Sequence, residues 1–516
     1  MGHVAEDLRP LALGVLTTGF VGTELPGWLA GLLREGLAGA WLFGQNVADV
    51  TQVRAVTGAV HEAAPHALVC SDEEGGTVTR LHHREGSPWP SAWALGRGEP
   101  AATRAVYEGL GRDVAAAGID LGASPVADVN TEPRNPVIGV RSFGPDPGRV
   151  ARHVAAAVAG LRAAGVLSCA KHFPGHGSTR LDSHVALPVL EVTEETLRAR
   201  ELLPFRAAVA AGVDVVMTGH LVVPGFGQRP ATLTAALMTL LREEFGFTGV
   251  ICTDALDMAA VAQEYGRARG AVLALGAGVD LVCIGNPAHP EAYDAHADTE
   301  HLAAAIVAAV LDGELPEQRL REAAARVRRL GKRQAARRAA GTPAPDPSAP
   351  GARSAKTPSG ADHPGLAAAR RAVVITGTPV ALHAPTIVGA STAGNAASGA
   401  RQEVILRVLA DALGGTWCTV AQPEARPEAA GTPAGPVVAV CDDHTDLEDP
   451  GVRRLLDRAA AVVHTGVRPL DGVEPSWLVR TYSGGAAGGR AAAAALAPGI
   501  IPEPPAAHPP ARPGPA

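Results

Sequence analysis

Short apolar runs recur through the first two thirds of the chain, and each ends in polar residues. The runs cover residues 11–20, 39–46, 66–76, 119–130, 166–175, 213–223, 249–258 and 279–286. Stretches with helical spacing of apolar residues lie between them. Several of these stretches end in a glycine that precedes Val or Ile, at Gly118, Gly165, Gly212 and Gly278. A glycine in this place is typical of the left-handed cap that ends a helix before a strand begins.

Continuous apolar strands that alternate with helices indicate a parallel sheet covered by helices. Eight such units predict a (β/α)8 TIM-like barrel over residues 1–338, with an open doubly wound α/β sheet as the alternative. Residues 339–364 are rich in Pro, Ala, Gly and Ser, which is typical of a flexible linker.

A second set of α/β elements is predicted at residues 365–500. Apolar runs at 370–376, 435–443, 459–466 and 476–482 predict strands that alternate with helices, so we expect a smaller three-layer α/β sandwich domain. Its Gly-rich stretch at 389–400 contains no GxGxxG motif, and we expect no cofactor there. The Pro-rich tail at 501–516 is expected to be disordered.

Polar residues collect where the predicted barrel strands end. In a (β/α)8 barrel these ends meet at one face, and the loops there carry the chemistry. The set combines charged acceptors with charged donors, which suits a small polyhydroxylated molecule such as a carbohydrate. Its members are Asp72, Glu73, Glu74, Arg80, Asp128, Asn130, Arg141, Lys171, His172, Thr218, His220, Asp254 and Asp257.

The stretch KHFPGHGSTRLDSHVALP, at 171–188, is unusually dense in reactive side chains. Its Lys171 is one of only three lysines in a chain that otherwise uses arginine. Asp182 and His184 lie two residues apart, a spacing that lets the carboxylate hold the imidazole and favours proton transfer by His184. At the end of the seventh strand, Asp254 is a candidate nucleophile toward a sugar carbon.

The histidines of this stretch do not form an HExxH motif, and Pro174 with Gly175 excludes the helix that the motif needs. We therefore expect no metal. Structural explanations remain open for every candidate: Asp254 as a helix cap, His184 as an ordinary loop residue. Lys171 and His172 would pair with buried carboxylates inside the barrel. Arg80 and Arg141 would only stabilise long loops, and Asp72 would only form a structural contact at the end of a strand.

Composition and charge exclude several classes of partner. A net charge of −7 and an aromatic content of 3% argue against nucleic acid, and the Arg-rich stretch before residue 340 is interpreted as a solvated helix face. No apolar run reaches the length of a membrane span, and the N-terminus lacks a signal-peptide pattern. The six cysteines form no CxxC pair and are expected to be buried, reduced thiols, which predicts a cytoplasmic protein.

Several motifs together resemble one family. They are SDEEGGTVTRL, SPVADVN, NPVIGVRSFG, KHFPGHGSTRLDSH and GFTGVICTDALDM, spread over residues 10–340. The chain resembles glycoside hydrolase family 3, specifically its β-N-acetylglucosaminidase (NagZ-type) branch. KHFPGHG followed by DSH is characteristic of that branch.

The resemblance implies a retaining exo-β-N-acetylglucosaminidase that removes terminal β-linked GlcNAc from peptidoglycan fragments or chito-oligosaccharides. It implies that Asp254 is the nucleophile and His184 the general acid/base, with Asp182 as its partner. The implied substrate-binding residues are Asp72, Arg80, Arg141, Lys171 and His172.

Two positions depart from the family pattern, Ser178 where many relatives have Asp and Glu73 where Gln is common. Glu73 is expected to add a charge near the sugar. Because an imidazole repels an anionic acceptor less than a carboxylate does, a β-N-acetylglucosaminide phosphorylase is an alternative. A catalytically silent sugar-binding protein is another. The sequence predicts neither the aglycone nor the oligomeric state.

Overall fold

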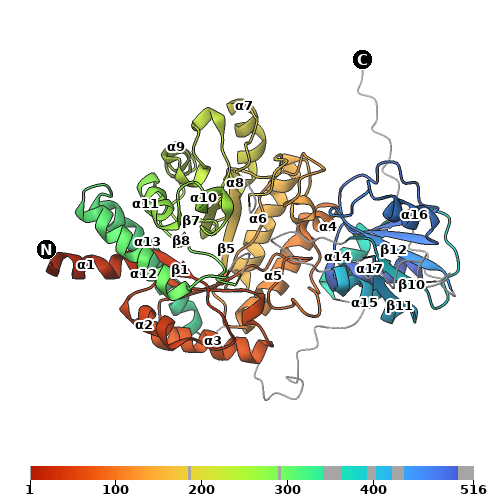
Figure 1. The fold of residues 1–516 in the computed structure, drawn as a ribbon, viewed down its shortest axis with the longest axis horizontal. Coiled ribbons are helices and arrows are strands. Elements are labelled where there is room, and N and C mark those ends of the chain that lie inside the picture. The colour runs from red at the N-terminus through yellow and green to blue at the C-terminus, as the bar shows by residue number, and fades with distance from the viewer. Residues whose placement is uncertain are drawn as a thin grey trace.

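The computed structural model describes residues 2–183, 187–288, 292–340, 363–391, 402–420 and 435–497. Two bodies are visible in Figure 1, a barrel built from the red to green part of the chain and a smaller domain in cyan and blue. The predicted linker at 339–364 and the predicted tail at 501–516 lie almost entirely outside the described residues.

The first domain contains eight parallel strands that form one sheet. They are β1 (Leu16–Thr18), β2 (Gly39–Leu42), β3 (Leu68–Ser71), β4 (Leu121–Gly122), β5 (Leu167–Phe173), β6 (Val215–Thr218), β7 (Val250–Thr253) and β8 (Val282–Cys283). Their order is β7-β6-β5-β4-β3-β2-β1-β8, and a bridge between Cys252 and Leu281 joins β7 to the start of β8. Each strand lies inside one predicted apolar run, which confirms the (β/α)8 barrel over the doubly wound alternative.

Helices surround these strands (Figure 1). They are α1 (Gly2–Leu13), α2 (Gly27–Glu35), α3 (Val50–Ala63), α4 (Ala92–Gly96), α5 (Pro100–Ala116), α6 (Pro147–Ala163), α7 (Glu194–Thr196), α8 (Leu202–Ala210), α9 (Ala235–Thr239), α10 (Ala259–Ala262), α11 (Arg267–Ala277), α12 (Ala295–Leu311) and α13 (Glu317–Ala339). The glycines predicted to end helices all have positive φ, between 76° and 119°. Left-handed backbone stops the helix and turns the chain into the next strand.

Three buried aspartates hold the amino-terminal end of the barrel together. Asp120, Asp214 and Asp280 stand just before β4, β6 and β8, each in the same Gly-x-Asp context. Each carboxylate accepts a hydrogen bond from a backbone N–H at the preceding strand in space, at 2.9 to 3.1 Å. A buried carboxylate also needs a cation, because an unpaired charge is costly to remove from water.

The Arg-rich helix α13 supplies those cations. The ion pairs are Arg338–Asp120, Arg333–Asp214, Arg319–Asp280 and Arg326–Asp280. Because Arg319, Arg326 and Arg333 are spaced by seven residues, about two helical turns, they lie on one face of the helix. The interpretation of this stretch as a solvated face is therefore wrong for Arg319, Arg326 and Arg338, which are partly buried, whereas Arg333 remains exposed while it pairs with Asp214.

The interior of the barrel is apolar and rich in sulfur. Cys70, Cys169, Cys252 and Cys283 pack there with Leu68, Leu121, Leu167, Val215, Met217, Val250 and Leu281. All are free thiols, as predicted, and burial raises the pKa of Cys70 and Cys283 well above the ordinary value. These sulfurs act as small apolar groups that fill the barrel.

The second domain is a three-layer sandwich around a six-stranded sheet. Its strands are β9 (Val374–Gly377), β10 (Thr386–Gly389), β11 (Thr416–Thr419), β12 (Val437–Cys441), β13 (Ala461–His464) and β14 (Trp477–Arg480), in the order β11-β10-β12-β13-β14-β9. Only β9 runs antiparallel to its neighbour among these described strands. The sequence predicted β9, β12, β13 and β14 but not β10 or β11.

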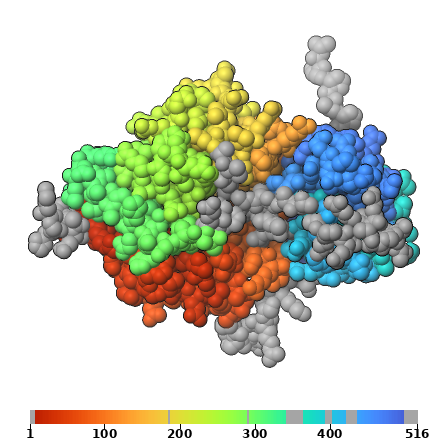
Figure 2. Space-filling view, viewed as in Figure 1, coloured from red at the N-terminus to blue at the C-terminus, as the bar shows by residue number. Residues whose placement is uncertain are grey.

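Four helices cover this sheet: α14 (Pro364–Ala372), α15 (Gln402–Leu413), α16 (Pro450–Arg458) and α17 (Gly485–Leu496). Alternate strand residues face opposite sides. Val438 and Val440 pack with α15 and α17, whereas Ala439 and Val462 pack with α16. Figure 2 shows the blue domain seated beside the orange part of the barrel.

We predict that Asp280→Ala lowers the free energy of unfolding by about 3 kcal/mol, because it removes a buried carboxylate and leaves its partly buried arginine partners without a counter-charge. Urea unfolding followed by circular dichroism measures the change. Arg321→Ala is the control, since Arg321 is 52% exposed and pairs with Glu317 on the surface of α13. An exposed pair contributes below about 1 kcal/mol. Equal losses in both variants would contradict the role given to Asp280.

Candidate active site

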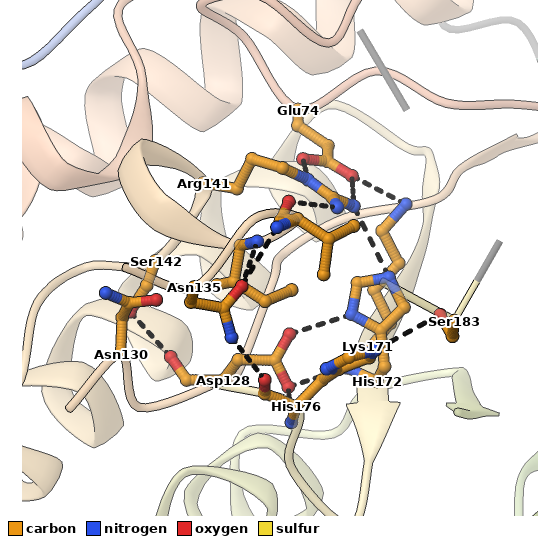
Figure 3. A network of polar contacts seen from close by, with 12 residues as sticks. Glu74, Asp128, Asn130, Asn135, Arg141, Ser142, Lys171, His172, His176 and Ser183 are labelled. Carbon is orange, nitrogen blue, oxygen red and sulfur yellow. Dashed lines mark hydrogen bonds and ion pairs between the residues drawn. The ribbon is translucent and has the colours of Figure 1, made fainter. Parts of the chain in front are cut away.

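The carboxyl ends of β3 and β5, with the loop after β4, bring four charged residues together, and Figure 3 shows three of them, Glu74, Arg141 and Lys171. The ammonium group of Lys171 lies 2.8 Å from a carboxylate oxygen of Asp72 and 2.7 Å from one of Glu74. Arg141 binds Glu74 through two hydrogen bonds, each 2.9 Å long. We call these four residues, Asp72, Glu74, Arg141 and Lys171, the charged cluster. Its two cations balance its two carboxylates, as burial requires.

Pairing fixes the protonation states of the charged cluster. Burial by itself lowers the pKa of Lys171, but the carboxylates of Asp72 and Glu74 raise it overall. For Glu74, burial raises the pKa, and the stronger combined effect of Arg141 and Lys171 lowers it to about 2. The net pKa of Asp72 is lowered in the same way by Lys171 and Arg80. All four groups are therefore charged at neutral pH.

Arg80 reaches the cluster from the loop after β3. Its guanidinium donates a 3.0 Å hydrogen bond to Asp72. The buried Glu73 holds this loop, since it accepts hydrogen bonds from the backbone N–H groups of Arg80 and Leu81, both at 2.6 Å. Glu73 thus acts as a loop anchor, and the expectation that it adds a charge near the sugar stays a prediction.

His172 has a defined tautomer. Its Nε2 lies 3.3 Å from a guanidinium nitrogen of Arg141, and its Nδ1 lies 2.7 Å from Asp128. Arginine only donates hydrogen bonds, so Nε2 accepts and Nδ1 carries the proton that is donated to Asp128. The His172 ring is therefore held in one orientation beside Arg141 by these two contacts.

Asp128 organises the loop that follows β5. It accepts the backbone N–H of His176 at 2.7 Å in addition to the imidazole of His172. His176 is buried, and burial lowers its pKa to about 4. Its ring contacts Thr179 at 2.6 Å and Ser183 at 3.1 Å, so a neutral histidine anchors the segment that contains Asp182. Sequence reasoning noted Asp128 at a strand end but missed this role.

The other side of this loop is also anchored. Asn135 donates its side-chain amide to the carbonyl groups of His176 and Thr179, at 2.8 and 3.0 Å. Ser178 donates to the buried Glu201 at 2.8 Å. Asp182 is partly buried in this loop, whereas His184 lies outside the described residues. The pairing of Asp182 with His184, and the distance from His184 to Asp254, therefore stay predictions.

Asp254 stands directly after β7 and is partly buried. Its backbone N–H donates to Thr218 at 3.0 Å, and its carboxylate accepts from the N–H of Ala255 at 2.8 Å. His220, which is buried, approaches the carbonyl oxygen of Ala255 at 2.9 Å. The end of β6 therefore fixes the backbone that carries Asp254.

Asp254 lies at the same end of the barrel as the charged cluster. Asp72 directly follows β3 and Asp254 directly follows β7, and all eight strands run parallel in one sheet. The ends of β3 and β7 therefore open on the same face of the barrel. The nearby Asp257 is different in character, because burial raises its pKa to about 7.

The described residues contain no group of three or more His, Cys, Asp or Glu side chains that could hold a metal ion. Among the described helices, none is long and apolar enough to cross a membrane.

Comparison with known proteins points to one family. The chain is 33% identical to β-hexosaminidase A of Pseudoalteromonas piscicida over 337 residues, which cover 60% of this chain and 55% of that protein. The chain thus spans about half the length of this relative. It is 39% identical to a β-hexosaminidase of Xylella fastidiosa strain M23, over 54% of this chain and 84% of the relative.

A solved structure is similar over nearly the whole chain. The β-N-acetylglucosaminidase of glycoside hydrolase family 3 from Paenibacillus sp. str. FPU-7 superposes with a TM-score of 0.80 at 28% identity, covering 96% of this chain and 97% of that one. The family model described as "Glycosyl hydrolase family 3 N terminal domain" matches residues 29–330, more than half of this chain. The chain therefore belongs to glycosyl hydrolase family 3.

Proposed function

We propose that this protein is a retaining exo-β-N-acetylglucosaminidase that hydrolyses terminal β-linked GlcNAc. The observation that carries the proposal is the position of the Asp254 carboxylate directly after β7, at the same end of the parallel barrel as the charged cluster. The names of its relatives, β-hexosaminidase and β-N-acetylglucosaminidase, support this class of reaction.

The charged cluster is suited to hold a sugar. Lys171 has three ammonium protons, and Asp72 and Glu74 accept two of them, so one remains for a sugar hydroxyl. Asp72 is partly exposed and retains acceptor capacity for another hydroxyl. Arg80 and His172 are the further substrate-binding residues of the proposal. Because its ion pairs fix each group, the cluster holds donors and acceptors in place before the sugar arrives.

The proposed chemistry is a double displacement. The Asp254 carboxylate attacks the anomeric carbon, and the bond to the leaving oxygen breaks as that oxygen takes a proton from His184. Water then gives its proton to His184 and displaces Asp254 from the same carbon. Two inversions retain the β configuration. In this proposal Asp182 holds the His184 ring and stabilises its charged form.

Peptidoglycan fragments and chito-oligosaccharides are the proposed natural substrates, because both carry terminal β-linked GlcNAc. A cytoplasmic location is proposed from the cysteines, which are all free and mostly buried.

Phosphorolysis is a second candidate, favoured by an imidazole in place of the second carboxylate used by most glycosidases. A neutral imidazole does not repel phosphate as a carboxylate would. Addition of phosphate would then raise turnover and yield the sugar 1-phosphate. Unchanged rate and product in phosphate exclude this candidate, and a protein that binds GlcNAc without turnover would be a silent sugar-binding protein.

We predict that Asp254→Ala lowers kcat on p-nitrophenyl β-GlcNAc by more than about 10³-fold, because no glycosyl-enzyme forms. Release of nitrophenol measures the rate. Asp257→Asn is the control, since it removes the other carboxyl group of the TDALD segment, at residues 253–257. The pKa of Asp257 is raised to about 7 by burial, and the residue has no proposed catalytic role. A loss below about tenfold is expected for the control. Full activity of Asp254→Ala refutes the nucleophile assignment.

We also predict that Lys171→Met raises KM by about tenfold or more, because a sugar donor is lost. Asp72 and Glu74 have lowered pKa values in the folded protein, so their stabilising effect is present at neutral pH and disappears as the pH falls toward 2. Relative to the wild type, Lys171→Met should therefore lose much stability at pH 7 and less at pH 3. Thermal unfolding of both proteins at the two pH values measures this loss. An equal loss at pH 7 and pH 3 would contradict the ion pairing of Lys171 with Asp72 and Glu74.

A further inference from the structure

The second domain contacts the two barrel loops that carry the charged cluster. We call residues 72–91 the β3 loop and residues 123–146 the β4 loop, after the strands that they follow. The first contains Asp72, Glu74 and Arg80, and the second contains Arg141. Figure 1 shows the second domain on this side of the barrel.

Contacts with the β3 loop are close and involve backbone. Ser91 donates its N–H to the hydroxyl of Ser483 at 3.0 Å, and both residues are buried. The N–H of Ala487, at the start of α17, donates to the carbonyl of Ser87 at 3.1 Å. A methyl group added to Gly485 would lie only 2.7 Å from the carbonyl oxygen of Gly76. The two backbones therefore meet without space for a side chain.

More contacts hold the same loop along its length. Arg407 of α15 donates to the carbonyl of Arg84 at 2.8 Å. A methyl group on Gly86 would lie 2.3 Å from a side-chain carbon of Val404. The ring of His363, which caps α14, lies tilted against that of Trp89, with ring centres 4.6 Å apart. Buried Glu73 fixes the loop from inside the barrel, and the second domain fixes it from outside.

The β4 loop meets the second domain at Asp443, near the turn that holds Arg141. Asp443, which follows β12, accepts hydrogen bonds from the N–H groups of Val467 and Arg468, both at 2.7 Å. Its other carboxylate oxygen faces Gly139, where an added methyl group would lie 2.9 Å away. Gly139 has a φ of +45° and opens the short helical turn that contains Arg141.

We propose that the second domain positions the sugar-binding cations of the barrel, through Gly485 behind the β3 loop and Asp443 behind the turn that holds Arg141. The charged cluster joins these two loops by way of Glu74, which binds both Lys171 and Arg141. A shift of either loop changes the geometry of the whole cluster. The domain therefore acts on substrate affinity although it contributes no proposed catalytic residue.

The test compares Gly485→Ala with Gly414→Ala. Both glycines belong to the second domain and have positive φ, 72° and 64°, so both variants carry similar backbone strain. A methyl group on Gly414 meets nothing within 4 Å, whereas one on Gly485 displaces Gly76. We expect KM for p-nitrophenyl β-GlcNAc to rise about fivefold or more in Gly485→Ala relative to Gly414→Ala, with kcat within about twofold.

Amide hydrogen exchange of residues 74–91 gives a readout that needs no substrate. Exchange there should be faster in Gly485→Ala than in Gly414→Ala, at equal melting temperatures. The kinetic measurement rests on the proposed function, but the exchange measurement does not. If the wild-type protein has no hydrolase activity but Gly485→Ala exchanges faster than Gly414→Ala, the proposed function is refuted and the positioning role is supported. If the two variants have equal exchange and equal KM, the positioning role is overturned.

A double-mutant cycle tests the second contact. Gly139→Ala should raise KM because its methyl group meets Asp443. In an Asp443→Ala background, the factor by which Gly139→Ala raises KM should be at least about threefold smaller, since the opposing carboxylate oxygen is gone. Independent, multiplicative effects of the two substitutions on KM would contradict a direct contact and overturn this part of the proposal.

Discussion

The carboxyl end of the barrel depends on one buried ammonium group that two carboxylates share. Asp72 and Glu74 come from the same loop and repel each other, and Lys171 lies between them at 2.8 and 2.7 Å. Arg141 adds the second cation and ties the β4 loop to the same carboxylate. The β3 loop, the β4 loop and β5 are thus held in the one arrangement that pairs every charge of the cluster. Truncation of any one of these side chains would leave an unpaired buried charge, which is costly.

The two ends of the barrel use ion pairs for different purposes. At the amino-terminal end, each aspartate meets arginines of α13, and no proposed site residue lies there. At the carboxyl end the charges remain partly accessible through Asp72 and Arg80, which are 19% and 13% exposed. An apolar interior separates the two ends. Stability and chemistry are therefore placed at opposite ends of the same strands, as the (β/α)8 architecture allows.

The sequence predicted the barrel well because each strand is a compact apolar run bounded by a glycine cap and polar residues. It predicted four strands of the second domain and missed two. The strand β10 has only two large apolar residues, Ile387 and Val388, and β11 is exposed at Trp417, so neither gives an apolar run. Local pattern is a weak guide where burial is incomplete.

Site residues were predicted as individuals at strand ends, but their partners were not. The pairing of Lys171 with Glu74, 97 positions apart in the chain, follows from sheet order and not from spacing. The partners of Glu73 were not predicted either, since they are backbone N–H groups of its own loop. The arginines of α13 look solvated in sequence because their aspartates lie about 40 to 220 positions earlier.

The arginines of α13 have a consequence for the order in which this protein is made. Asp120 is synthesised more than 200 residues before Arg338, its counter-ion. During translation the early strands emerge before the arginines of α13, the last helix of the barrel, which pair with all three aspartates. The barrel is thus completed late, after the ribosome has passed α13, so chaperones that shield nascent chains would act on nearly the whole of this domain.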